Sequence, residues 1–326
     1  MRTSLLAALL LVTPVLAAQN PRDMTPAERQ QMEAQNTALA ATMKDVPRLP
    51  FDQAPITVIP PAGQPGWEMG MVSWVAADRQ GLIYLLQRGD KADPVLVVDR
   101  GGHIVRSWGR GLYTTPHAIR IDPQGNVWTT DAASSMVYKF SPDGKLLMKI
   151  EVGGQPSPCG AFCSTTDIAF APDGHLFISD GYRNARVLEY SADGKKLNEW
   201  GSAGTGPGQF RLPHSIEMGP DGTLYVADRE NGRVQRFDRT GKFLGEWTTF
   251  GKTFGMAMAE GALWLSTTPR GANLQPGWLM KIDPATGRML GAVDSGGNHG
   301  MAVMPDGSLL QAPGPDLVPQ IYTPKQ

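Results

Sequence analysis

The sequence predicts an all-β protein, a six-bladed β-propeller with four short antiparallel strands in each blade. Its composition is the first observation: the 326 residues include 38 Gly and 27 Pro, more turn-forming residues than helical proteins usually carry. The second observation is an internal repeat, seen in PHAIRIDPQGNVWTTD, STTDIAFAPDGHLFISD, LPHSIEMGPDGTLYVAD and NHGMAVMPDGSLLQA. These segments share an alternating strand, a glycine turn and a second strand, with further strands after them. Four strands per unit of roughly 40 to 50 residues is typical of a propeller blade.

The glycine of the first turn in each repeat counts the blades. These glycines are Gly81, Gly125, Gly174, Gly222, Gly261 and Gly307. The sixth repeat ends after three strands, so we expect a strand from before the first blade, Ile56–Ile59, to complete it and close the ring. The predicted propeller covers residues 56–326, and a polar leader with a weak helical pattern and no predicted chemistry covers residues 19–55.

The extreme N-terminus has the pattern of a secretory signal peptide. Arg2 precedes a short apolar stretch, and small residues end it at Ala17 and Ala18. Residues 1–18 are therefore expected to be removed, and they are too short to span a membrane. We expect the mature protein to be secreted or periplasmic. The balance of 30 Lys and Arg against 31 Asp and Glu excludes a nucleic-acid-binding protein that works through a basic surface.

Two cysteines, Cys159 and Cys163, lie close together in the segment SPCGAFCS. In an exported protein such a pair most often forms a local disulfide bond. A metal site held by thiolates needs more of them than this chain has. We therefore expect a disulfide bond that stabilises this loop.

Three of the five histidines occupy the same position in their repeats. His117, His214 and His299 each lie eight residues before the turn glycine of their blade. By chance the six equivalent positions would hold about 0.1 histidines. The other two, His103 and His175, lie beside turns and are interpreted as structural.

The three histidines come from blades two, four and six, which lie about 120° apart in a six-bladed ring. Because the first strand of a blade begins at the central channel, the three imidazoles are expected to converge on the axis. Three neutral nitrogens with one open position are typical of a catalytic zinc site. The alternative is that these histidines only pack and form hydrogen bonds in the channel.

Residues just after the second strand of a blade should surround the same mouth of the channel. They include Arg88, Tyr182 and Arg229. Two arginines beside a metal favour capture of a carboxylate, and a tyrosine close to positive charges would have a pKa below its usual value of about 10 and could act as a base. The alternatives are solvated rim charges and a packing tyrosine. Asp180 with Arg186, and Asp228 with Arg233, recur in two blades and are interpreted as scaffold pairs.

Around these residues the sequence resembles the NHL-repeat propellers, and more closely the lyase domain of peptidylglycine α-amidating enzyme. The resemblance extends over about residues 70–310. Its specific parts are QRG, LYTTPHAIRID, FCSTTDIAFAPDGHLFISDGYRNAR, GPGQFRLPHS and VADRENGRVQ. It implies Zn²⁺ held by His117, His214 and His299, with Tyr182 as the base and Arg88 and Arg229 orienting the substrate.

The activity implied by the resemblance is cleavage of a peptidyl α-hydroxyglycine to a peptide amide and glyoxylate. The substrate would be a small molecule or peptide that carries a carboxylate. The family tends to place Asp directly after the third histidine, where it helps to bind a structural calcium ion. Here Gly300 occupies that position, which makes bound Ca²⁺ doubtful. The cysteine of FCS matches a family cysteine whose partner normally follows the tyrosine, but Arg183 stands there, so Cys159 is the candidate partner.

Two other functions remain compatible with the sequence. One is a noncatalytic NHL propeller that binds a peptide or protein at the mouth of the channel. The other is a metal-dependent propeller hydrolase such as a lactonase, for which acidic ligands are expected rather than three histidines. Zinc content together with glyoxylate release separates the lyase from both.

Overall fold

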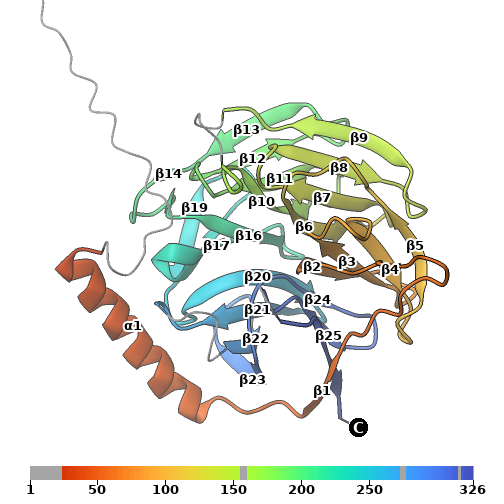
Figure 1. The fold of residues 1–326 in the computed structure, drawn as a ribbon. Coiled ribbons are helices and arrows are strands. Elements are labelled where there is room, and N and C mark those ends of the chain that lie inside the picture. The colour runs from red at the N-terminus through yellow and green to blue at the C-terminus, as the bar shows by residue number, and fades with distance from the viewer. Residues whose placement is uncertain (1–23, 155–159, 272–276, 315–316, 326) are drawn as a thin grey trace, which may run out of the picture.

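The computed structural model describes residues 24–154, 160–271, 277–314 and 317–325. Six four-stranded antiparallel sheets surround a common axis as the blades of a propeller (Figure 1). Within each sheet the strand order follows the chain outwards from the axis, apart from the last strand of the sixth blade. The predicted all-β, six-bladed fold is confirmed.

The strands of the first three blades are β2 (Val72–Ala77), β3 (Ile83–Gln87), β4 (Val95–Val98), β5 (Ile104–Trp108); β6 (Pro116–Ile121), β7 (Val127–Asp131), β8 (Met136–Phe140), β9 (Leu146–Glu151); and β10 (Thr165–Phe170), β11 (Leu176–Asp180), β12 (Arg186–Tyr190), β13 (Lys196–Trp200). A short parallel pair, β14 (Ser202–Ala203) and β15 (Gln209–Phe210), leads into the fourth blade. The last three blades contain β16 (Pro213–Met218), β17 (Leu224–Asp228), β18 (Arg233–Phe237), β19 (Phe243–Trp247); β20 (Lys252–Ala259), β21 (Ala262–Thr268), β22 (Gly277–Ile282), β23 (Met289–Ser295); and β24 (Met301–Val303), β25 (Leu309–Gln311), β26 (Gln320–Pro324), β1 (Phe51–Pro55).

The first strands of the six blades form the hub of the ring. Each hub strand contacts the next around the axis, from β2 through β6, β10, β16 and β20 to β24 and back to β2. The turn after each hub strand ends in the glycine that counted the blades, and all six glycines have φ between +72° and +87°. Only glycine adopts this conformation without strain, which explains why the repeat keeps one there.

The ring closes through β1, which pairs antiparallel with β26 as the outer strand of the sixth blade. The closing strand is Phe51–Pro55 and not the predicted Ile56–Ile59, so the propeller begins five residues earlier than expected. The sequence FDQAP has a charge, a proline and four exposed residues, which suits an edge strand but lacks the apolar alternation by which buried strands are recognised.

The leader contains one helix, α1 (Pro26–Asp45), which lies along the outside of the ring (Figure 1). Thr25 and Glu28 form a capping box at its start. Leu39 and Met43 are buried against the fourth and fifth blades, so the helix is docked on the propeller rather than free of it. The weak helical pattern of the sequence is therefore confirmed, and the helix has a packing role that the sequence did not indicate.

Two predictions concern segments that the structure does not describe. The signal peptide, residues 1–18, lies outside the described residues, and so does Cys159. Cys163 is fully buried, but its disulfide bond with Cys159 remains a prediction. Within the described ranges, no helix has both the length and the apolar character needed to cross a membrane.

Candidate metal centre and the surrounding mouth

The structure brings the three histidines of the repeat together on the axis. His117 lies on β6, His214 on β16, and His299 just before β24. The distances between their ring centroids are 5.0, 5.0 and 4.9 Å, so the imidazoles form a nearly equilateral triangle. One ligand atom from each ring lies within 4.8 Å of the other two. The predicted convergence of alternate blades is therefore present in the fold.

Each imidazole is oriented by the hub strand of the next blade. In all three, Nδ1 lies 2.6 Å from a main-chain carbonyl oxygen, that of Thr166 on β10, Phe254 on β20 and Ser73 on β2 respectively. Because a carbonyl only accepts hydrogen bonds, Nδ1 must carry the proton in each ring. Nε2 is therefore left with its lone pair, the form that a metal ligand requires.

Burial keeps these imidazoles neutral. The pKa values of His117 and His214 lie well below the usual 6.5, mainly because burial disfavours the charged form. The pKa of His299 is lowered to about 3, mainly by burial and in addition by the charges of Arg88 and Arg229. The three rings are thus neutral at neutral pH, with Nε2 free of a proton, as metal binding requires.

The donor set fits one metal ion with an open coordination position. Three neutral imidazole nitrogens are a ligand set for zinc, whereas calcium prefers carboxylate and carbonyl oxygens. Among the described residues, the three histidines are the one group of three or more His, Cys, Asp or Glu side chains close enough to share an ion. Gly300 supplies no carboxylate beside His299, so the acidic ligand expected there for calcium is absent from this position.

Tyr182 follows β11 and faces the histidine triangle. Its Oη lies 2.8 Å from Nε2 of His117 and 3.4 Å from Nε2 of His214. Burial raises the pKa of Tyr182 above 10, while the charges of Arg229 and Arg88 lower it. The sequence argument considered the charges alone, and in the metal-free chain burial outweighs them, so the phenol is neutral.

Arg88 follows β3 and has a donor that the protein does not use. Its Nε donates to the carbonyl of Pro116 at 2.8 Å, but Nη2 is buried without a hydrogen-bond partner. Its guanidinium also lies 5.0 Å from the ring centroid of Phe162. A buried guanidinium nitrogen with no partner is costly unless a ligand supplies one.

Arg229 follows β17 in the fourth blade and is fixed by neighbours on two sides. Its Nε donates to Glu230 at 2.9 Å, and its guanidinium lies 5.0 Å from the ring centroid of Phe254. Glu230 also pairs with Lys252 at 2.7 Å. With Arg88, this group holds three cations and one carboxylate, so the mouth is positively charged and suits an anionic ligand.

Several residues of the mouth were not found by sequence reasoning. The ring centroids of Phe162 and Tyr182 are 4.9 Å apart, and Lys252 forms an ion pair with Glu230. Phe254 places its ring against Arg229 and its carbonyl oxygen against Nδ1 of His214. Glu230 could have been found, since it directly follows Arg229. Phe254 could also have been found, since it lies seven residues before Gly261, one position after that of the histidines in the repeat. Phe162, in the loop before β10, and Lys252, at the start of β20, carry no repeat signal.

None of the residues interpreted as structural belongs to the histidine triangle. Asp180 binds Arg186 at 2.9 Å and Asp228 binds Arg233 at 2.8 Å, and both carboxylates are buried. His103 and His175 form surface or partly buried pairs with Asp99 and Glu189, respectively.

Comparisons with known proteins agree with this architecture. A family model for the NHL repeat matches residues 210–237. Over 200 residues the chain is 36% identical to peptidylglycine alpha-amidating monooxygenase from Rattus norvegicus. This alignment covers 52% of this chain and 20% of the rat protein. The chain thus spans about a fifth of that relative's length. A probable peptidyl-alpha-hydroxyglycine alpha-amidating lyase from Caenorhabditis elegans is 29% identical over 283 residues, covering 76% of this chain and 80% of the worm protein.

Solved structures show the same fold. A gluconolactonase from Xanthomonas campestris aligns with a TM-score of 0.61 over 86% of this chain and 95% of that chain, at 15% identity. This likeness concerns the fold alone. The chain is thus a six-bladed propeller with an NHL repeat, and its sequence is similar to those of peptidyl-α-hydroxyglycine α-amidating lyases.

Proposed function

We propose that this protein is an exported zinc-dependent lyase that cleaves the C–N bond of a peptidyl-α-hydroxyglycine-like carbinolamide, releasing an amide and glyoxylate. One observation carries the proposal: three Nε2 atoms converge beside a tyrosine hydroxyl in a mouth lined by arginines. His117, His214 and His299 would hold the ion. When bound, zinc would supply a Lewis acid for the α-hydroxyl group and a positive charge beside the phenol of Tyr182.

The chain's own residues account for the rest of the reaction. Arg88 and Arg229 bind the substrate carboxylate, and Nη2 of Arg88 is the donor left open for it. Tyr182, as the phenolate, removes the proton of the α-hydroxyl. The electron pair of that O–H bond forms the carbonyl of glyoxylate while the C–N bond breaks. The amide nitrogen takes the proton back from Tyr182, so no oxidant or reductant is needed.

Metal analysis followed by a glyoxylate assay on an α-hydroxyglycine compound tests the proposal. The purified protein should hold about one zinc per chain and release glyoxylate. His117→Ala and His214→Ala should each lose the metal and the activity, because two imidazoles do not retain a catalytic zinc. The matched control is His103→Ala, since His103 pairs with Asp99 away from the triangle. A protein with neither zinc nor glyoxylate release would leave the noncatalytic propeller as the better hypothesis, and lactone hydrolysis without glyoxylate release would favour a hydrolase.

Tyr182→Phe separates metal binding from proton transfer. The variant should keep its zinc, because the phenylalanine leaves the three Nδ1 hydrogen bonds intact. Turnover should fall about 10²- to 10⁴-fold, the usual contribution of a general base. Equal turnover by this variant and the parent would remove Tyr182 from the mechanism.

We further propose export after removal of residues 1–18, with a disulfide bond between Cys159 and Cys163 in the mature protein. Mass spectrometry of the protein from the periplasm or medium should show a new N-terminus near residue 19. Peptide mapping without reductant should link the two cysteines. An intact N-terminus on cytoplasmic protein, with both thiols free, would contradict this part of the proposal.

A further inference from the structure

At the repeat position that follows that of the histidines, the hub carries two large aromatic rings, Trp74 and Phe254, among smaller residues. The positions seven residues before the turn glycines are occupied, blade by blade, by Trp74, Ala118, Asp167, Ser215, Phe254 and Gly300. Trp74 is completely buried. The space for it comes from its neighbours: a Cβ atom on Gly300 would lie 2.4 Å from Cδ2 of this indole.

The indole of Trp74 touches all three imidazoles. Its ring centroid lies 5.7 Å from that of His117, 6.1 Å from that of His214 and 5.5 Å from that of His299. It stacks on His214 and meets His299 edge-on. Its Nε1 is buried without a hydrogen-bond partner, so packing alone holds it. A buried indole N–H without a hydrogen bond is unfavourable. The contacts of the indole with the three imidazoles offset this cost.

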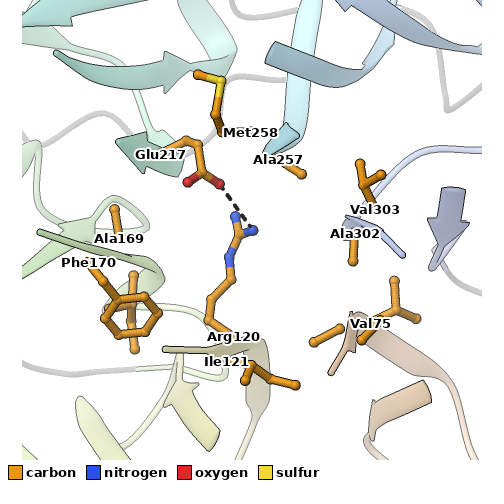
Figure 2. A pocket seen from close by; sticks show the side chains of 13 residues that line it. Val75, Arg120, Ile121, Ala169, Phe170, Glu217, Ala257, Met258, Ala302 and Val303 are labelled. Carbon is orange, nitrogen blue, oxygen red and sulfur yellow. Dashed lines mark hydrogen bonds and ion pairs between the residues drawn. The ribbon is translucent and has the colours of Figure 1, made fainter. Parts of the chain in front are cut away.

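The guanidinium of Arg120 also packs on this indole, 5.4 Å from its ring centroid. Arg120 belongs to a different part of the channel, an inner cavity of about 200 Å³ that Figure 2 shows from close by. There Arg120 points towards Glu217, and apolar side chains such as Val75 and Ala302 line the wall (Figure 2). None of the three histidines lines this cavity, and neither does Trp74. The cavity is large enough for several water molecules.

We propose that Trp74 is a positioning residue for the metal centre: it forms the inner wall behind the three imidazoles and keeps the water of the inner cavity away from the ion. The backbone carbonyls fix Nδ1 of each ring, but a single hydrogen bond leaves the ring free to tilt about it. Contact with the indole restricts that tilt. A zinc ion held by the three histidines would then be accessible only from the mouth with Tyr182 and the arginines. This inference rests on the proposed zinc site.

Zinc affinity and the absorption spectrum of the cobalt-substituted protein test this role. Trp74→Ala and the milder Trp74→Phe should raise the zinc dissociation constant about 10- to 100-fold, the usual effect of residues that orient metal ligands. The visible bands of bound Co²⁺ should change in position and intensity, because extra water reaches the ion and the ligand geometry relaxes. The matched control is Trp128→Ala: Trp128 is equally buried but packs between the second and third blades, away from the triangle. The control should lose stability and keep both the zinc affinity and the spectrum.

The possible results separate this inference from the proposed function. A parent protein that binds no zinc would overturn both. A parent that binds zinc and releases glyoxylate, with Trp74→Phe and Trp74→Ala matching its affinity and cobalt spectrum, would overturn the role of Trp74 alone. Trp74→Phe keeps an aromatic ring in the hub, so it provides a folded variant even if Trp74→Ala does not fold.

Discussion

Gly300 packs directly against Trp74 in the hub, and this close contact leaves no room for a larger side chain at residue 300. The Cβ of Gly300→Ala would lie 2.4 Å from the indole and 2.8 Å from Cα of Trp74, so the backbone itself would have to move. Overpacking of this kind costs about 1 to 3 kcal/mol. We expect urea unfolding to show a loss in that range for Gly300→Ala, and a smaller loss when Trp74→Phe is added.

Gly153→Ala is the control for that substitution, because a Cβ there meets no atom within 4 Å. Its unfolding free energy should stay within about 0.5 kcal/mol of the parent's. If Gly300→Ala were as stable as Gly153→Ala, the close packing of the hub against Trp74 would be wrong.

Arg88 should contribute to substrate binding through the carboxylate. Arg88→Met removes the donor at Nη2 and the cation while retaining most of the apolar stem. For a substrate with a carboxylate, kcat/KM should fall about 10²-fold, and for an analogue in which an amide replaces the carboxylate the parent and the variant should differ little. Arg110→Met is the control, since Arg110 is largely exposed and pairs with Asp93. Equal losses for both substrates would assign Arg88 to the scaffold.

At the residue scale, the sequence predicted the site residues that occupy equivalent positions in the repeats. His117, His214 and His299 were found by counting back from the turn glycines, and counting one residue fewer finds Trp74. Phe162 and Lys252 could not be found in this way, because contacts with Tyr182 and Glu230 depend on how loops fold over the mouth. The charge of Tyr182 also required the structure, since burial and nearby cations act on it in opposite directions.

Helix α1 is the element whose importance the sequence understated. Its side chains reach the loop after β21: Asn36 accepts from the main-chain N–H of Arg270 at 2.8 Å, and Gln35 accepts from Arg270 Nη1 at 2.6 Å. Arg270 in turn donates to the carbonyl of Glu230 at 2.7 Å, next to Arg229. Asn36 and Arg270 are 234 positions apart in the sequence, so no local pattern could indicate this support of the mouth.

Leu39→Ala tests whether α1 is part of the folded unit. Leu39 is 1% exposed and packs with Phe250 and Met280 of the fifth blade region. Its truncation should lower the unfolding free energy by about 2 to 5 kcal/mol, because a cavity forms in a packed cluster. Leu147→Ala on β9 is the control, since Leu147 is 48% exposed and should change stability by less than about 0.5 kcal/mol. Similar values for the two variants would mean that the helix is only loosely attached.

At the scale of the whole molecule, counting glycines predicted the number of blades and a shared sixth blade. The exact closing strand was not predicted because Phe51–Pro55 is mostly exposed and is held by main-chain pairing with β26. The more apolar Ile56 lies just outside that strand and is buried instead in the cluster around the first blade. Hydrophobic pattern thus located the segment that packs, whereas the edge strand is determined by main-chain pairing.

A charged network across the hub makes stability depend on pH. Arg120 of the second blade binds Asp167 of the third at 2.8 Å and approaches Glu217 of the fourth at 3.5 Å. Burial raises the pKa of Glu217 to about 7, although Arg120 opposes the shift. Between pH 4.5 and 7 the unfolded chain therefore loses this proton while the folded chain retains it, so Glu217 lowers stability as the pH rises through that range.

Glu217→Gln removes this titration and keeps a similar shape. Relative to the parent, the variant should gain on the order of 2 kcal/mol in unfolding free energy between pH 4.5 and pH 8, less than the full shift implies because the Glu217 side chain is 20% exposed. Urea unfolding at several pH values measures the difference, with Glu33→Gln on the exposed face of α1 as the control. A difference between Glu217→Gln and the parent that stays constant with pH would show that Glu217 ionises in the hub as freely as it does in the unfolded chain.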